Sequence, residues 1–382
     1  MPIDFEAMIH FLKALVRTES LPGQEKKAID LAAAEMTRLG YDNIAIDDYG
    51  NLSGVVNGAH AGPTLLLDAH VDTVGVAPGV PWQHEPFGAV IQDGRMYGRG
   101  TTDMKGPLAA ILYAVAAIDP AGLKGRIVYS VSVMEEVIEG YLLEPVISKY
   151  TPDMVIIGEP SDMKLILGGR GRAEILFTAT GRPAHSSLPE QGINAVHLMT
   201  AAIKEIEAAP LPDHPEIGPA VMALTDIISQ PYPGHSMIPS ICRATYDRRT
   251  LPGETEEQIL GTFNGLAALE RIQTEIATAK YTTYTGKEMT VLKFFPAWYL
   301  EKEHDLARMA ASGLRACGVA NGFGTWPFNT NATYTAGIKG IPTIGFGPSK
   351  EKLAHIVDEY IDLDELRAAT RGYLRIINHI LA

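Results

Sequence analysis

Four short apolar runs in this chain are each followed by acidic or histidine side chains. The runs span residues 64–67, 126–133, 154–157 and 341–346, and the side chains that follow them are His70 and Asp72, Glu135 and Glu136, Glu159, and His355. Short apolar runs bounded by turn residues are typical of buried strands. In open α/β sheets, ligands bind outside the carboxyl ends of the strands. We therefore expect an α/β fold in which residues far apart in the sequence converge at one edge of a sheet.

The middle of the chain has a different pattern. Residues 172–180 alternate as a half-exposed strand does, 192–208 have helical spacing, and 241–248 and 273–284 are strand-like. Strands mixed with helices predict a small α+β domain inserted into the larger one. The predicted catalytic domain comprises residues 1–174 and 291–382, and the predicted inserted domain comprises residues 175–290.

The net charge and the hydropathy of the chain argue against two classes of protein, those that bind nucleic acid and those that span membranes. The net charge is −13, from 32 Lys and Arg against 45 Asp and Glu, which argues against nucleic acid because phosphates are bound by basic surfaces. The longest apolar run, 107–118, is shorter than the ~20 residues that span a bilayer, and the N-terminus lacks the pattern of a signal peptide. Cys242 and Cys317 are too few for a disulfide framework. We expect a cytoplasmic protein that binds neither nucleic acid nor membranes.

Taken singly, the polar residues have simple structural explanations. His70 and Asp72 lie on the same side of an extended segment, which suits a carboxylate that orients a metal-bound histidine but also a packed strand end. Asp103, in the glycine-rich segment 98–106, would serve as a helix N-cap. Adjacent glutamates are common in solvated turns. Glu159 would be a turn residue before a proline, and His355 would be a histidine of a surface loop.

Taken together, these residues predict a metal site. Two histidines and three carboxylates are donors that divalent metals accept; they are His70, Asp103, one of Glu135 and Glu136, Glu159 and His355. A bridging carboxylate can hold two metals ~3.5–4 Å apart, as in two-metal hydrolases. If one of the adjacent Glu135 and Glu136 binds a metal, the other stays free and can act as a general base. The donors alone do not select one divalent metal, since oxygen-rich sites accept cobalt or manganese as well as zinc.

Longer motifs identify a family. The chain resembles the zinc metallopeptidase superfamily of acetylornithine deacetylase, succinyl-diaminopimelate desuccinylase, aminoacylase and the glutamate carboxypeptidases. The matching stretches, in family order, are LLLDAHVDTV (65–74), YGRGTTDMKG (97–106), VMEEV (133–137), GEPS (158–161), GRPAHSSLPEQGINA (181–195), DRRTLPGET (247–255), IPTIGFGP (341–348) and AHIVDE (354–359). The resemblance implies zinc as the metal, a mixed-sheet catalytic domain and an inserted lid and dimerisation domain.

The resemblance also implies roles for single residues. His70 and His355 would each ligate one zinc, Asp103 would bridge both, and Glu136 and Glu159 would each hold one metal. Asp72 would orient His70, and Glu135 would transfer a proton from the attacking water to the leaving amine. A cis peptide bond is implied just after Asp103.

Further residues are implied to act on the substrate. His185 matches a histidine that, in dimeric relatives, enters the partner's active site and stabilises the oxyanion, which implies a homodimer through the lid. Arg248 matches an arginine that binds the substrate carboxylate. Ser236 stands where relatives have an asparagine thought to hold substrate, and Asn329 is assigned to the pocket by its position alone. Residues 137–139 (Val-Ile-Glu) replace glycines that often follow the paired glutamates in relatives.

The predicted reaction is hydrolysis of an amide bond. N-deacylation of an N-acyl amino acid or a related small acid is favoured, by a metal-bound hydroxide with Glu135 as general base. A dipeptidase or aminopeptidase, or an N-carbamoyl amide hydrolase, would use the same two-metal site. A different class, a binding protein without catalysis, is disfavoured because the chain keeps all five predicted ligands.

Overall fold

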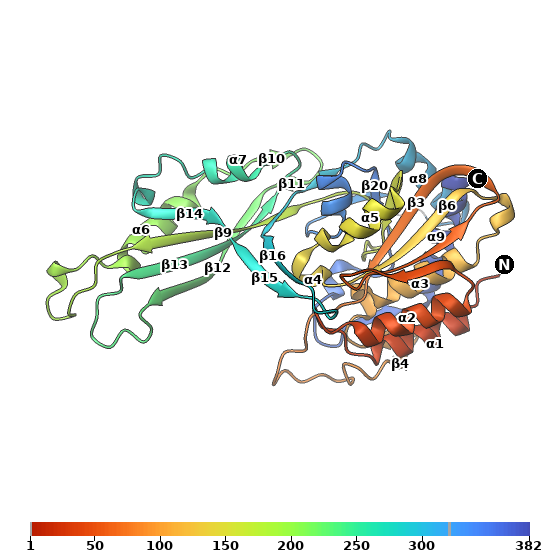
Figure 1. Ribbon diagram of the computed structural model, residues 1–382, viewed down its shortest axis with the longest axis horizontal. Helices are drawn as coiled ribbons and strands as arrows, with labels where there is room; N and C mark the ends of the chain where they lie inside the picture. Colours follow the sequence, from red (N-terminus) through yellow and green to blue (C-terminus); the bar gives the residue numbers. More distant parts are fainter. Residues whose placement is uncertain (1, 320–321) are drawn as a thin grey trace.

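The computed structural model describes residues 2–319 and 322–382 of the chain. The molecule is elongated, and its two parts lie at opposite ends of the view in Figure 1. Both termini belong to the larger part, so the smaller part is an insertion into it. This arrangement agrees with the predicted two-part α/β architecture.

The larger part is built on a mixed sheet of nine strands within the described residues. Along the sheet lie β1 (Asp42–Ile46), β2 (Leu52–Asn57), β6 (Lys124–Ser132), β3 (His60–His70), β7 (Met154–Ile157), β20 (Thr343–Gly345), β8 (Leu165–Gly169) and β18 (Trp298–Tyr299), and β19 (Phe323–Trp326) also pairs with β8. The central strands β6, β3, β7 and β20 are parallel. Their carboxyl ends therefore share one edge of the sheet.

Helices cover both faces of this sheet (Figure 1). On β3, Leu65 and Leu67 pack into a core with helices α1 (Phe5–Val16), α2 (Lys26–Arg38), α3 (Gly106–Ala116), α8 (Asp305–Ala316) and α9 (Leu363–Leu381). Leu66 packs into a second core, with α5 (Glu144–Tyr150). Successive side chains of a strand point to opposite faces. A strand covered on both faces is therefore continuously apolar, as Leu65, Leu66 and Leu67 are. Burial of each leucine contributes ~1.5–3 kcal/mol to the free energy of folding.

A three-stranded sheet joins two distant segments at the edge where the parallel strands end. It consists of β4 (Val90–Gln92), β5 (Arg95–Tyr97) and β21 (Tyr360–Asp362), with β21 paired antiparallel to β5. This pairing fixes the segment that follows β5 beside the loop that precedes β21. Asp103 lies in the first of these segments and His355 in the second.

The smaller part is a five-stranded antiparallel sheet packed against helices. Its strands are β12 (Val221–Gln230), β13 (Ile241–Thr250), β9 (Gly171–Thr180) and β14 (Ile272–Ile276), with β17 (Phe294–Phe295) also paired to β9. Phe177 of β9 is buried with Met199 of α6 (Ala195–Ala208) and Ile259 of α7 (Glu256–Gly261). A short hairpin, β10 (Asp213–His214) and β11 (Gly218–Pro219), precedes β12. This is the predicted α+β composition.

The predicted strand 273–284 is divided in two. Its first half is β14 of the smaller sheet, and its second half, β15 (Thr278–Thr282), pairs instead with β16 (Glu288–Leu292). Tyr284, in the turn of this hairpin, donates a hydrogen bond from its hydroxyl to the backbone oxygen of Gly50 at 3.0 Å, so the hairpin packs on the larger part. The predicted domain boundaries at 174/175 and 290/291 stay a prediction.

None of the helices in the described part of the chain has the length and apolar character needed to cross a membrane.

Candidate metal centre

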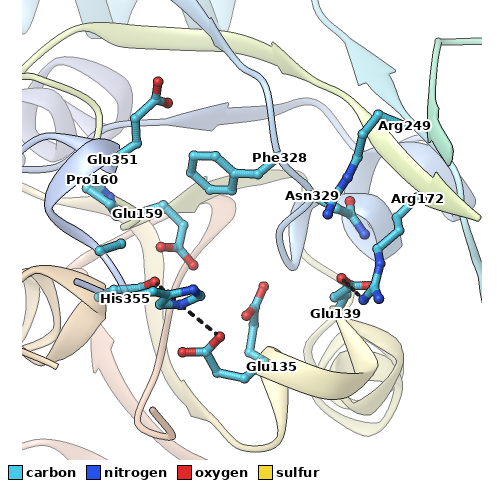
Figure 2. Close-up of a pocket in the computed structure, with 13 residues that line it drawn as sticks. Glu135, Glu139, Glu159, Pro160, Arg172, Arg249, Phe328, Asn329, Glu351 and His355 are labelled. Carbon is cyan, nitrogen blue, oxygen red and sulfur yellow. Dashed lines mark hydrogen bonds and ion pairs between the residues drawn. The ribbon is translucent and has the colours of Figure 1, made fainter. Parts of the chain in front are cut away.

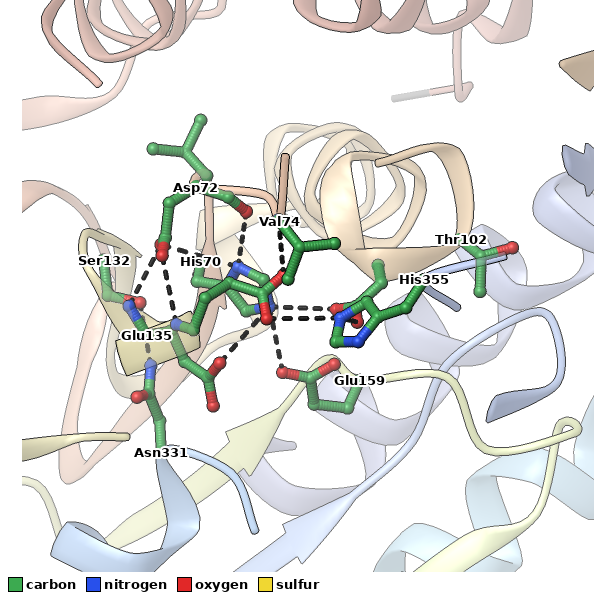
Figure 3. Close-up of polar contacts among 12 residues, drawn as sticks. His70, Asp72, Val74, Thr102, Ser132, Glu135, Glu159, Asn331 and His355 are labelled. Atoms are coloured by element: carbon green, nitrogen blue, oxygen red, sulfur yellow. Dashed lines mark hydrogen bonds and ion pairs between the residues drawn. The ribbon is translucent and has the colours of Figure 1, made fainter. Parts of the chain in front are cut away.

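The five predicted ligands converge at the edge where the parallel strands end; Figure 3 labels three of them, His70, Glu159 and His355. His70 is the last residue of β3, Glu136 lies in the short helix α4 (Glu135–Ile138) directly after β6, and Glu159 follows β7 by two residues. His355 lies in the loop after β20, and Asp103 precedes α3. The peptide bond after Asp103 is cis.

Asp103 lies between the two histidines. Its Oδ1 is 3.0 Å from His70 Nε2, and its Oδ2 is 3.0 Å from His355 Nε2. Glu159 Oε1 lies 3.3 Å from His70 Nε2, and Glu136 Oε2 lies 3.2 Å from His355 Nε2. The side chains therefore form two groups of three donors that share Asp103: His70 with Glu159, and His355 with Glu136.

Asp72 holds two parts of the centre at once. Its backbone oxygen is 2.9 Å from His70 Nδ1, whereas its carboxylate Oδ1 is 3.6 Å from that nitrogen. The carboxylate instead accepts the backbone N–H groups of Glu135 and Glu136, each at 3.1 Å. Asp72 thus orients the imidazole through its main chain and the start of α4 through its side chain.

Glu135 stands apart from both groups of donors. Its Oε2 lies 3.8 Å from His70 Nε2, and the residue lines the cavity over the centre. Burial, together with the neighbouring Glu159, Glu136 and Asp72, raises its pKa well above the usual value against the opposing effect of His70. A carboxyl group in this position can exchange a proton with a bound molecule.

The charges of the centre suit bound cations. Burial raises the pKa of Glu159 to about 7 and that of Asp72 to about 7. Hydrogen bonds that His355 donates to the carboxylates of Asp103 and Glu136 raise its pKa to about 10. Carboxylates crowded in this way repel one another unless cations neutralise them. The nitrogen and oxygen donors and the bridging position of Asp103 fit a pair of divalent metal ions.

A cavity of ≈ 390 Å³ opens over the centre (Figure 2). Glu135, Glu159 and His355 lie on one side of it, and Glu139, Arg172, Arg249 and Asn329 lie on the other. Arg172 and Arg249 belong to β9 and β13 of the smaller sheet. The cavity is therefore walled by both parts of the molecule.

Arg248 does not reach this cavity, contrary to the prediction. Its guanidinium is fully buried and pairs with Glu254 at 2.5 Å. Arg249, the next residue of β13, lines the cavity instead. Neighbouring side chains of a strand point to opposite faces, and Arg248 shares the inner face with the buried Tyr246. That alternation, present in the sequence, is the signal that would have selected Arg249.

Of the other residues predicted to act on the substrate, one lines the cavity and two lie outside it. Asn329 lines the cavity. Ser236 is exposed, and its backbone oxygen accepts the N–H of Ser186 at 2.9 Å, away from the cavity lining. His185 is also exposed on the smaller part, with Nδ1 2.7 Å from the Ser187 hydroxyl. Within one chain neither residue belongs to the site.

Glu139 and Arg172 were not predicted as site residues. Arg172 joins Glu139, at the end of α4, to the smaller sheet through an ion pair of 2.9 Å. Glu139 and Arg172 are some thirty residues apart, and no sequence pattern links them. The one signal in the sequence was that residues 137–139 differ from the glycines that relatives often have there.

Known proteins resemble this chain over nearly its whole length. A family described as "Peptidase family M20/M25/M40" matches residues 66–379. The uncharacterized protein YgeY of Escherichia coli (strain K12) is 31% identical over 368 residues, which cover 93% of this chain and 90% of YgeY. Succinyl-diaminopimelate desuccinylase 2 of Ruegeria sp. (strain TM1040) is 28% identical over 381 residues, covering 95% of this chain and 92% of the enzyme.

The fold has solved counterparts. The crystal structure of Bacillus subtilis YXEP, described as a dinuclear metal binding peptidase from the M20 family, superposes with a TM-score of 0.72 at 14% sequence identity. The superposition covers 99% of this chain and 98% of that one. The likeness extends to both the mixed sheet and the inserted domain.

Proposed function

This chain belongs to peptidase family M20/M25/M40, a family of hydrolases that act on amide bonds, and we propose that it removes the acyl group from N-acyl amino acids. One observation carries the proposal. A carboxylate, Asp103, lies between two histidines, each with a further carboxylate, at the floor of a cavity that also holds Glu135 and Arg249. That arrangement provides metal ligands, a proton carrier and a cationic anchor within one site.

His70, Asp103 and Glu159 would hold one divalent ion, and His355, Asp103 and Glu136 the other. When bound, such ions supply Lewis acidity to a substrate carbonyl and make water a stronger acid. The name of the Bacillus subtilis neighbour supports a dinuclear site. We propose zinc as the native metal, with cobalt or manganese as substitutes.

Glu135 is the proposed general base and acid. It removes a proton from the attacking water and delivers that proton to the leaving nitrogen. Asp72 keeps Glu135 in place because its carboxylate binds the backbone N–H of that residue. His185 is proposed to stabilise the oxyanion from a second copy of the chain, which would make the enzyme a homodimer through the inserted domain.

Arg249 is the proposed anchor for the substrate carboxylate, in place of Arg248. Its Nε pairs with Asp247 Oδ1 at 2.8 Å, which fixes the guanidinium while its outer edge lines the cavity. A guanidinium binds a carboxylate with two parallel hydrogen bonds. A substrate with a free carboxylate therefore suits the site, and the desuccinylase among the relatives favours one whose amine is acylated.

The same machinery would serve a dipeptidase, an aminopeptidase or an N-carbamoyl amide hydrolase. A metal-dependent assay separates these. We would remove metal with a chelator, restore zinc, cobalt or manganese, and measure amine release from N-acetyl, N-succinyl and N-carbamoyl amino acids and from dipeptides. We expect metal-restored release from one N-acylated class. Cleavage of dipeptides alone would replace the deacylase with a peptidase, and a protein that neither binds metal nor hydrolyses any of these compounds would contradict the proposal.

A further inference from the structure

The wall of the cavity opposite the metal centre has polar groups without protein partners. Glu139 and Asn329 line this wall and are each 7% exposed. Within the described residues, Glu139 Oε2 and both polar atoms of the Asn329 amide have no hydrogen-bond partner. Buried polar groups in native proteins are almost always paired, so such orphans call for an explanation. Their place beside the substrate cavity indicates that a ligand supplies the missing partners.

The charges of this wall are balanced. Arg172 is held by Glu139 at 2.9 Å, by Glu174 at 2.6 Å and by Asp247 at 2.7 Å. Asp247 also pairs with Arg249, and Glu174 pairs with Lys293 at 3.4 Å. Three carboxylates thus face three cations. Glu139 itself is paired with Arg172, so a charged ligand group beside Glu139 and Asn329 would be buried without an opposite charge of its own, whereas a neutral polar group needs none.

The unpaired atoms match one neutral group in particular. Glu139 Oε2 can only accept a hydrogen bond when ionised, and the Asn329 amide both donates and accepts. A terminal CO–NH₂ group also donates through its nitrogen and accepts through its oxygen. Its NH₂ can serve Glu139 and the Asn329 carbonyl, while its oxygen accepts from the Asn329 nitrogen.

We propose that Glu139 and Asn329 form a specificity subsite for a terminal CO–NH₂ group, a carboxamide or a ureide, on the amine half of the substrate. The inference rests on the proposed function, in which Arg249 binds the carboxylate of that same half. Arg249 and the subsite lie on the same wall of the cavity (Figure 2). The substrate amino acid would then carry its carboxylate to Arg249 and its uncharged polar end to Glu139 and Asn329.

The test compares substrates that differ only at the end of the side chain. With zinc-loaded enzyme, we would measure kcat/KM for the N-acetyl derivatives of glutamine, citrulline, norleucine, glutamate and ornithine. We expect glutamine or citrulline to exceed norleucine, glutamate and ornithine by about tenfold or more, since a site built for a polar group rejects analogues that lack it. Glutamine against citrulline distinguishes a carboxamide from a ureide. A norleucine derivative cleaved as well as both would overturn the subsite while leaving the deacylase intact.

A binding measurement separates this inference from the choice of acyl group. By calorimetry, free glutamine or citrulline should bind the zinc-loaded protein about tenfold more tightly than free norleucine. If no N-acetyl or N-succinyl amino acid is hydrolysed but this difference in affinity is found, the proposed reaction fails and the subsite stands. Equal affinities would contradict the subsite whatever the outcome of the kinetics.

Variants assign the preference to the two residues. Asn329→Ala should lower the ratio of kcat/KM for the preferred CO–NH₂ substrate over norleucine by about tenfold, mainly through KM. Asn329→Asp should shift preference toward ornithine, because it adds a negative charge and removes a donor. Glu139→Gln should also lower the ratio; if it fails to fold after losing its charge opposite Arg172, the Asn329 variants decide. Asn264→Ala, in an exposed loop of the smaller part, is the control, and an Asn329→Ala ratio equal to that of this control would refute the assignment.

Discussion

At the scale of single residues, the role of each charged side chain in the site depends on which of its atoms already contact other protein groups. Both carboxylate oxygens of Asp103 face histidine nitrogens at 3.0 Å, so this side chain sets the spacing of the two groups of donors. Glu135 belongs to neither group and remains free to carry a proton. Arg249 has one face on Asp247 and the other on the cavity. These differences give neighbouring charged residues distinct tasks.

Glu135→Gln tests the proton carrier. The amide keeps the shape of the side chain but cannot take up a proton, so we expect kcat to fall by about 10²–10⁴-fold with two metals still bound. Steady-state kinetics and atomic emission on the same sample measure both. Glu144→Gln, on the exposed surface of α5, is the control. An unchanged kcat in Glu135→Gln would remove Glu135 from the mechanism.

Arg249→Ala and Arg248→Ala separate binding from stability. The first removes the proposed carboxylate anchor, so we expect KM to rise about 10- to 100-fold with kcat less affected. The second removes a buried guanidinium and leaves Glu254 unpaired, so we expect a loss of about 3 kcal/mol in the free energy of unfolding. Kinetics and urea unfolding of both variants provide the comparison. A larger KM effect in Arg248→Ala would reverse the assignment.

At the scale of elements, buried carboxylates fix the segments that carry the ligands. Asp72 binds the first two backbone N–H groups of α4, and Glu25, fully buried at the start of α2, binds the N–H of Met134 just before it at 3.1 Å. Met134 has a positive φ of 57°, a conformation that needs support from its surroundings. Two separate acids therefore hold the turn that directs Glu135 and Glu136 into the site.

On the other side of the metal centre, the buried carboxylate of Glu359 holds the segment that carries Asp103. Glu359 is fully buried, its Oε2 lies 2.5 Å from Arg99, and its Oε1 accepts the N–H groups of Thr102 and Asp103. Gly347 shows how closely these loops approach, because a Cβ there would lie 2.4 Å from the backbone oxygen of Glu159. The ligand-bearing loops are thus held by contacts between segments far apart in the chain.

Glu359→Ala tests this support. It leaves Arg99 buried without its partner, which should destabilise the protein by about 3–5 kcal/mol. It also frees the Asp103 loop, so we expect metal affinity to fall by about 10- to 100-fold. Thermal unfolding and metal titration measure the two effects. Asp364→Asn, a nearby and exposed change, should alter neither; equal metal affinity in both variants would mean that Glu359 supports only the fold.

At the scale of the whole molecule, one chain leaves His185 outside the cavity. The residue is exposed on the smaller part, and that part ends in the edge strand β12, where Ile227 and Ile228 are each 47% exposed. Apolar residues on an exposed edge strand suit pairing with another chain. A homodimer through the smaller part would cover them, and its symmetry would exchange one His185 for the other.

Mixing two inactive variants tests that exchange. His185→Ala and Glu135→Gln should each be nearly inactive alone. If His185 acts in the partner's site, a mixed dimer has one complete site, so subunit exchange at equal amounts should restore about a quarter of wild-type activity. Sedimentation of the wild type checks the dimer itself. No recovery despite proven exchange, or full activity of His185→Ala, would contradict the role in the partner subunit.

The sequence alone determined the α/β class, the inserted α+β part, the family and which residue types could bind metal. These features are local: apolar runs, strand ends and motif order survive as patterns along the chain because burial on both faces of a sheet dictates them. The position of acids and histidines after strands β3, β6, β7 and β20 is likewise visible along the chain, whatever the order of these strands in the sheet.

Only the tertiary structure decided what those side chains contact. It turned Arg248 inward and Arg249 toward the cavity, divided residues 273–284 between two sheets, and brought Glu139 beside Arg172. It also left the Asn329 amide unpaired in the cavity wall. Each of these outcomes depends on one-residue register or on contacts between distant segments. Such contacts are set by the packing of the whole chain, and a one-residue shift in a strand reverses the face on which a side chain lies.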